Sequence, residues 1–304
     1  MRFVYIGLGT LALFVVALMT GAVDIPATEV LGILMGKDTE NTVWRVIVLE
    51  SRLPMAMTAL LSGASLSIAG LMLQTTFQNP LAGPSILGVS SGASMGVAIV
   101  MLLGGGALAS AGALQYVSVI AGAIAGAAAV ILLLLGLSSS LRSSAMLLIA
   151  GIMLSYLASS VISLLNFFAP ADGVKSFVVW GLGSFGGVTA SELPLFCTVL
   201  AAALFSSALF IKPLNALLLG ERYTANMGYS VKRLRSLLLC LSGILTAFVT
   251  AFCGPIGFIG IVVPHIARMI FKTSNHSILI PATMLCGAAL TLACSVLTTI
   301  PGSS

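Results

Sequence analysis

Charge is scarce in this sequence. Only 7% of its 304 residues are charged, 59% are hydrophobic, and the mean hydropathy is +1.17. A soluble domain carries roughly 25% charged residues. Because so few charges cannot cover a water-exposed surface, lipid must be the solvent for most of the chain. The composition predicts one membrane domain over residues 1–304 without a soluble appendage.

Groups that perform covalent chemistry are also missing. No G-x-x-x-x-G-K-[ST] phosphate loop occurs, so we do not expect the chain to bind ATP by that route. The apolar runs contain no carboxylate, which argues against acid–base catalysis and against ion coupling. The two histidines, His265 and His276, have no second metal ligand at helical spacing. No basic run is interleaved with aromatics, so nothing indicates a nucleic-acid partner. We expect no catalytic residue, no metal site and no cofactor.

Two further patterns are interpreted as structural. The five cysteines lie in or at the ends of apolar stretches without a C-x-x-C pair, and we interpret them as small buried hydrophobes. A G-x-G-x-x-G string runs from Gly181 to Gly186 but follows no strand. Its glycines predict an irregular turn beside a short helix.

Long uncharged runs predict membrane-spanning helices. The run from Phe3 to Val23 exceeds the core of a secretory signal and is read as an uncleaved first span. The 89 uncharged residues between Arg52 and Arg142 are divided at Asn79-Pro80 and at residues 104–106. We expect spans near 53–77, 86–103 and 112–136, followed by others near 145–168, 193–211 and 277–298.

The 32 uncharged residues between Arg235 and Arg268 are ambiguous, because they fit one long helix or two shorter ones. Gly254-Pro255 lies inside this run, and proline breaks or kinks a helix. If it splits the run, the piece from Ile256 to Ala267 is too short to cross lipid alone and must be a half-depth helix among neighbours.

The distribution of basic residues bears on this ambiguity. If the N-terminus is cytoplasmic and every segment reverses direction, nine of the 13 basic residues lie inside. These are Arg2, Arg142, Lys212, Arg222, Lys232, Arg233, Arg235, Arg268 and Lys272. Basic residues near span ends favour the cytoplasm, so the count supports a reversing short piece. Without that reversal, Arg268 and Lys272 move outside and the bias weakens. The arrangement gives nine segments, and the turn sequence at residues 301–304 suggests that a tenth span is missing.

The loop at residues 212–235 predicts two short helices. Leu214, Leu217 and Leu218 form one apolar face of the first, which Gly220 stops. The second begins near Glu221 and ends at Gly228, a suitable C-cap. Such a pair is too polar to span a membrane and too apolar for water. It lies either on lipid headgroups or against a cytoplasmic protein.

Three long motifs resemble one known family. The stretch from Arg52 to Ala93 reads RLPMAMTALLSGASLSIAGLMLQTTFQNPLAGPSILGVSSGA. It closely resembles the permeases of ABC importers for cobalamin, iron-siderophore complexes and haem. A second signature matches residues 254–268, GPIGFIGIVVPHIAR, and a third resembles residues 221–235. The motifs occur in the family's order, and the resemblance covers essentially the whole chain.

The resemblance implies a fold and partners. Permeases of this family are all-α transmembrane bundles of ten spans that work as dimers, here a homodimer or a pair with a close paralogue. The translocation pathway follows the dimer axis. Two cytoplasmic ATPase subunits bind below, and a periplasmic substrate-binding protein docks above. The implied location is the bacterial inner membrane with a cytoplasmic N-terminus.

Individual residues take roles only by this resemblance. Arg52 matches an arginine that pairs with a carboxylate of the binding protein, whereas Met55 stands where the family often has a second arginine. The family's coupling helices match residues 214–235. They include the following candidate contacts to the ATPase: Leu214, Leu217, Leu218, Gly220, Glu221, Arg222, Gly228 and Arg233.

Two pairs match positions near the cytoplasmic mouth of the family's pathway. Asn79 and Pro80 match a turn between spans, and Ser143 and Ser144 match the start of the fifth span. They are gate candidates, while the alternative is simple turn and capping chemistry.

The sequence therefore predicts the permease subunit of an ATP-driven importer that works by alternating access. The competing hypothesis is an ion-coupled secondary carrier or channel without an ATPase. An intramembrane enzyme lacks the catalytic groups. The residues do not distinguish among a siderophore complex, haem and cobalamin as the substrate.

Overall fold

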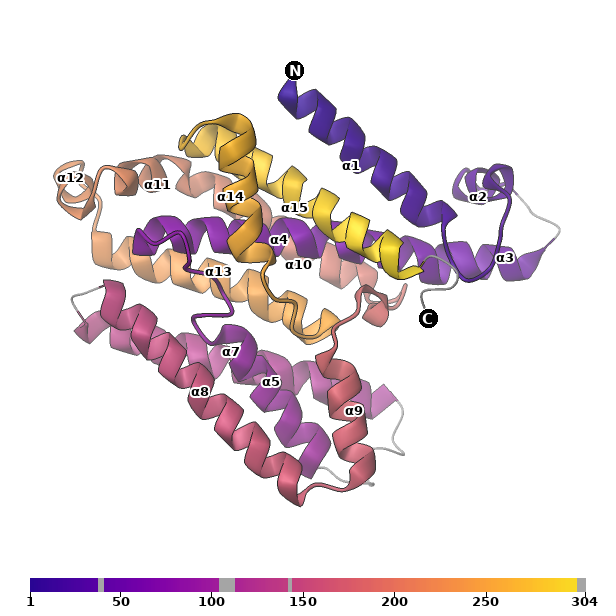
Figure 1. Cartoon of the computed structure of the whole chain (residues 1–304), viewed down its shortest axis with the longest axis horizontal. Helices are drawn as coiled ribbons and strands as arrows, with labels where there is room; N and C mark the ends of the chain where they lie inside the picture. Colours follow the sequence, from indigo (N-terminus) through magenta and orange to yellow (C-terminus); the bar gives the residue numbers. More distant parts are fainter. Residues whose placement is uncertain (38–40, 104–112, 142–143, 300–304) are drawn as a thin grey trace.

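The structure is a computed structural model that describes residues 1–37, 41–103, 113–141 and 144–299. Over these ranges the chain is helical and contains no strand, and its long helices lie side by side (Figure 1). This arrangement confirms the predicted all-α membrane bundle. In lipid, a helix satisfies its own backbone hydrogen bonds, which is why apolar runs of this length adopt it.

Within the described residues, seven helices are long and apolar enough to cross a membrane, and two shorter ones accompany them. The long ones contain α1 (Arg2–Met19), α4 (Leu53–Phe77), α7 (Ala113–Ser140), α8 (Ser144–Phe168), α10 (Leu193–Ser207), α13 (Val231–Cys253) and α15 (His276–Thr299). The shorter ones contain α5 (Val89–Ala98) and α14 (Ile259–Phe271). All nine lie where the uncharged runs predict them. That a tenth span is missing from the sequence stays a prediction.

Shorter helices connect the spans. They are α2 (Ala27–Leu34), α3 (Thr42–Val46), α9 (Ala171–Gly181), α11 (Ile211–Leu218) and α12 (Glu221–Asn226). A π-helical stretch, Ile47–Arg52, joins α3 to α4, so one continuous helix runs from Thr42 to Phe77. The helix that contains the second span therefore begins earlier than the predicted residue 53.

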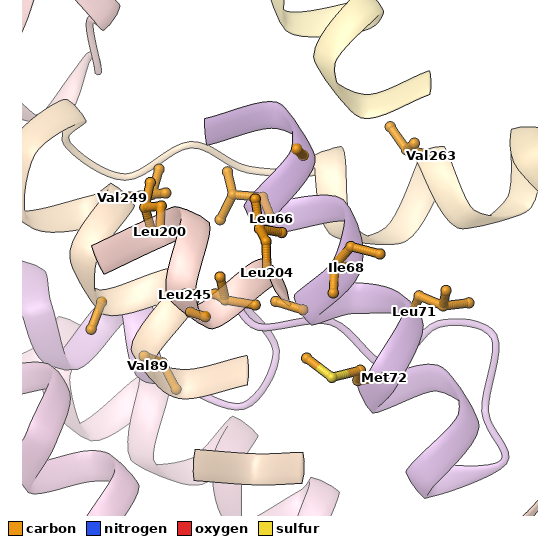
Figure 2. Close-up of a cluster of buried hydrophobic side chains, with 14 of the residues drawn as sticks. Leu66, Ile68, Leu71, Met72, Val89, Leu200, Leu204, Leu245, Val249 and Val263 are labelled. Carbon is orange, nitrogen blue, oxygen red and sulfur yellow. The ribbon is translucent and has the colours of Figure 1, made fainter. Parts of the chain in front are cut away.

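The core surrounds α4, which is buried along most of its length against α10, α13, α14 and α15. Figure 2 shows buried side chains of this cluster, including Leu66, Leu71 and Met72 of α4, Leu200 and Leu204 of α10, and Leu245 and Val249 of α13. Small residues let the backbones approach: a Cβ at Gly63 would overlap Gly287 of α15. Close packing of this kind drives helix association in lipid, where apolar surfaces gain nothing by leaving water.

Two G-x-x-x-G pairs pack against each other. Gly92 and Gly96 of α5 cross Gly122 and Gly126 of α7, and an added Cβ at any of the four would meet backbone of the facing helix. These four glycines therefore permit the close packing of two helices within one chain.

α14 is the half-depth helix that the split at Gly254-Pro255 predicts. It has 13 residues, which at 1.5 Å each span about 20 Å. Gly254 and Phe258 both have positive φ, at 75° and 65°, and turn the chain sharply before the helix begins. Gly260 then contacts Gly70 of α4, within the last two turns of that helix. α14 thus starts deep in the bundle and runs to the end where α4 finishes.

The N-terminus lies at the same end of the bundle as the end of α14 and the start of α11. Arg2 Nη1 donates to the Ile270 carbonyl at 2.8 Å, and the rings of Phe3 and Phe271 are 4.5 Å apart. Asn215 of α11 donates to Asn275 at 3.0 Å. The short piece therefore reverses direction, as the distribution of basic residues favours.

Candidate functional site

The site is built around two short helices at one end of the bundle, α11 and α12 (Figure 1). These two helices and the linker between them, Leu219-Gly220, are here called the foot. α10 continues through a 3₁₀ turn at Ala208–Phe210 into α11. Gly220 has φ 104° and ψ 159°, a conformation that is essentially restricted to glycine. It starts α12 in a new direction. Gly228, with φ 88°, turns the chain between the end of α12 and the start of α13.

Two leucines anchor the foot to the bundle. Leu214 and Leu217 are buried in the main core, whereas Leu218 is 44% exposed. Only two of the three leucines of the predicted apolar face are therefore covered, because α11 packs against the bundle along one side and leaves Leu218 exposed.

An ion pair fixes α12 against α13. Arg235 Nη2 donates to Glu221 Oε1 at 2.6 Å, and Arg235 is buried while the Glu221 side chain is 46% exposed. The Thr224 hydroxyl donates to the Gly220 carbonyl at 2.9 Å. These contacts make the foot a defined shape instead of a loose loop.

The outward surface of the foot is apolar with a basic margin. Leu219, Tyr223 and Met227 are 64%, 48% and 54% exposed. Arg222 and Arg233 are exposed beside them. Sequence reasoning did not assign the first three residues to this surface, because helical spacing identifies an apolar face but not which part of it is left uncovered. Exposed apolar side chains together with exposed charges on one short segment are typical of a protein interaction site.

A cleft of about 530 Å³ separates the foot from the turn after α4. It is lined by Gln78, Asn79, Pro80, Leu219, Gly220 and Arg268, among others. Two gate candidates, Asn79 and Pro80, thus lie opposite the linker of the foot. Asn79 Oδ1 also accepts from Leu81 N at 2.9 Å, which is the turn chemistry of the alternative reading. Ser143 lies outside the described residues. Ser144 starts α8, and the conformation of its side chain is not described.

Arg52 lies near the opposite end and is 6% exposed. Its Nη1 donates to the Leu18 and Met19 carbonyls at 3.1 and 2.9 Å, and its Nη2 donates to the Val23 carbonyl. The last carbonyls of α1 have no partner within the helix, so the guanidinium caps them. Gly21 leaves room for it, since a Cβ there would lie 2.9 Å from the guanidinium.

The glycine-rich string forms the predicted irregular turn at this same end. α9 ends at Gly181, Gly183 has φ 75°, and the Ser184 hydroxyl accepts from Gly186 N at 3.1 Å. Ser184 N donates to the Cys253 carbonyl at 2.8 Å, which ties this turn to the end of α13. The string is therefore a structural junction between two loops.

Comparison with known proteins identifies the family to which this fold belongs. Residues 9–301 match the FecCD transport family. The chain belongs to this family. Two vitamin B12 import system permeases named BtuC are each 34% identical to the chain. The protein from Klebsiella pneumoniae aligns over 83% of the chain and 74% of its own length, and that from Serratia proteamaculans over 96% and 83%. A solved structure described as an inward-facing ABC transporter of metal-chelate type superposes with a TM-score of 0.84 at 28% identity, over 99% of the chain and 93% of that structure.

The chain is thus a permease of the FecCD and BtuC type, a transport component of a type II ABC importer. Membership implies that it spans a membrane several times, forms dimers, and works with an ATPase and a substrate-binding partner.

Proposed function

We propose that this permease is the membrane-spanning subunit of an ATP-driven importer in the bacterial inner membrane for an iron-siderophore complex, haem or cobalamin. Two copies, or one copy and a close paralogue, form the pathway between them. ATP is hydrolysed on separate cytoplasmic subunits, and a periplasmic binding protein delivers the substrate. The permease supplies a path whose two conformations bind the partners differently.

The foot is the observation that carries this proposal. It is anchored by buried leucines and an ion pair on one side, and it presents Leu219, Tyr223 and Met227 outward on the other. A groove on an ATPase subunit fits this chemistry, because an apolar helix face with basic margins docks into an apolar groove with acidic margins. When the ATPase subunits close, they would displace the foot, and Asn79 and Pro80 across the cleft would act as gate elements together with Ser143 and Ser144.

The opposite end would receive the binding protein, with Arg52 at its margin. The guanidinium donates to three carbonyl oxygens of the chain. We therefore propose that Arg52 stabilises the conformation in which the segment after α1 would contact the binding protein. A direct ion pair with a carboxylate of the binding protein, which the resemblance implies, is the other outcome of the test described in the Discussion.

The deciding experiment is co-purification of the tagged chain from its native host. We expect an ABC ATPase subunit to be recovered in equal amount with the permease. Recovery of a transport-competent permease without an ATPase would indicate a secondary carrier instead.

The substrate requires a separate experiment, because the relatives support the class without fixing the compound. A deletion strain should lose growth or uptake on one of three defined sources: a ferric siderophore, haem or cobalamin. Restoration by the full chain on that source identifies the substrate. Normal uptake of all three by the deletion strain would refute the proposed range.

A further inference from the structure

A hydrogen-bonded chain links the foot to two core helices through the buried side chain of His276. His276 is the first residue of α15 and is fully buried. Its backbone N and its Nδ1 lie 2.8 and 2.9 Å from Asn215 Oδ1 of α11, and because an amide oxygen only accepts, both nitrogens donate. Its Nε2 lies 2.9 Å from Thr75 Oγ1 of α4. Three helices therefore meet at one imidazole.

The same turn of α4 also contacts α14 and the foot. Gln74 Oε1 accepts from Arg268 Nη1 at 2.6 Å, and Gln74 Nε2 donates to the Ile261 carbonyl at 3.1 Å. Gln78 Nε2 donates to the Leu217 carbonyl of α11 at 3.0 Å. Polar side chains on one turn of α4 thus hold the three elements that converge at this end.

These contacts differ in kind from the apolar anchoring by Leu214 and Leu217. Dispersion contacts are less directional than hydrogen bonds, so they tolerate a small shift of one helix against another better than a hydrogen bond does. A hydrogen bond is lost by a shift of about 1 Å, and a buried partner such as the His276 imidazole is then left unpaired. α11 therefore cannot move relative to α15 and α4 without either breaking the chain or carrying them with it.

We propose that Asn215, His276 and Thr75 form a relay that makes α15 and α4 follow the displacement of the foot. The inference rests on the proposed function, because an ATPase must supply the displacement. The three residues are positioning residues, since they act by fixing where the helices lie.

The test compares Thr75→Val with Thr76→Val. Both threonines are buried, and each hydroxyl oxygen lies close to a carbonyl oxygen of its own helix, 3.0 Å from Leu71 for Thr75 and 2.7 Å from Met72 for Thr76. Only the hydroxyl of Thr75 also meets His276. The two variants therefore remove the same group from adjacent positions and differ in the relay contact. Thr75→Ser restores the hydroxyl and serves as the rescue.

The reporter is Cys294, an exposed cysteine towards the other end of α15, with the other four cysteines replaced by alanine. The complex with its ATPase is placed in lipid nanodiscs, and maleimide labelling is timed without nucleotide and after trapping with Mg-ATP and vanadate. Wild type, Thr76→Val and Thr75→Ser should show a nucleotide-dependent change in labelling rate of about fivefold. Thr75→Val should lose that change while its ATP hydrolysis stays within about twofold of wild type.

Each other result overturns the relay. Equal responses of Thr75→Val and Thr76→Val would show that the contact with His276 transmits nothing. A wild-type labelling rate that ignores nucleotide would show that α15 does not follow the foot. Loss of ATPase association in Thr75→Val alone would assign the contact to the shape of the foot. Absence of any ATPase from the wild-type complex would refute the proposed function as well, and this outcome is distinct from the others.

Discussion

Arg52 donates hydrogen bonds to three carbonyl oxygens just after α1, and Gly21 supplies the space in which its guanidinium lies. Its residue type and position in the family motif suggest a docking charge. Its neighbours in the folded chain indicate a cap. The two roles predict different behaviour, because a cap depends on where the guanidinium sits and an ion pair depends on its charge.

Two variants separate these roles. Arg52→Met removes the guanidinium, whereas Gly21→Val keeps its charge but occupies its space. If Arg52 acts as a cap, both should lower the free energy of unfolding by about 1–3 kcal/mol, because three buried or partly buried carbonyls lose their donor. Both should also weaken docking of the binding protein by a similar factor, measured as the Kd on permease in nanodiscs.

The matched control is Gly9→Val, since a Cβ at Gly9 has open space around it. A loss of docking confined to Arg52→Met, together with a wild-type affinity that falls steeply with salt, would instead support a direct ion pair.

The foot illustrates how one short element divides its residues between two tasks. Leu214, Leu217 and the Glu221–Arg235 pair hold it, and the exposed Arg222 and Arg233 flank its outward surface. We expect the double charge reversal Arg222→Glu and Arg233→Glu to uncouple ATP hydrolysis from uptake, because like charges would then face the acidic margin of the groove.

In reconstituted vesicles, substrate uptake should fall about tenfold or more while ATP hydrolysis continues. Lys175→Glu, an exposed charge reversal on α9, provides the control. Unchanged transport by the double variant would contradict this assignment.

The crossing of α5 and α7 depends on glycine. A Cβ at Gly126 would meet the backbone of Gly92 and Gly96, which cannot move aside as a flexible side chain can. Gly126→Leu should therefore destabilise the protein by about 1–3 kcal/mol or more through overpacking. Thermal unfolding in detergent should show a lower Tm than wild type.

Gly136→Leu is the control on the same helix, because a Cβ at Gly136 has no neighbour within 4 Å. Equal Tm values for the two variants would show that the crossing tolerates separation of the helices.

At the scale of the bundle, one end gathers the N-terminus, the foot, the end of α14 and the start of α15. If the basic residues there face the cytoplasm, Tyr223→Cys in a background without native cysteines should resist a membrane-impermeant maleimide on intact cells. Lys175→Cys, on α9 at the other end, should be labelled under the same conditions, and permeabilisation should expose both. Labelling of Tyr223→Cys on intact cells would reverse the proposed topology and exclude docking of an ATPase at the foot.

The sequence alone determined the positions of the spans and the division of the foot at Gly220, and it offered the half-depth helix as one of two alternatives. Each depends on local physical chemistry: apolar runs matched to lipid thickness, a glycine-proline break, and a backbone conformation that only glycine adopts readily. The family motifs added the class of transporter.

The tertiary structure decided which residues meet. His276 has no partner in its own sequence neighbourhood, and its contacts to Asn215 and Thr75 span 61 and 201 positions. The burial of Arg52 and the exposure of Leu219 likewise depend on which helices lie alongside. Spacing along one chain reports the faces of a helix, whereas partners across helices follow from how all the helices pack, and no local pattern encodes that.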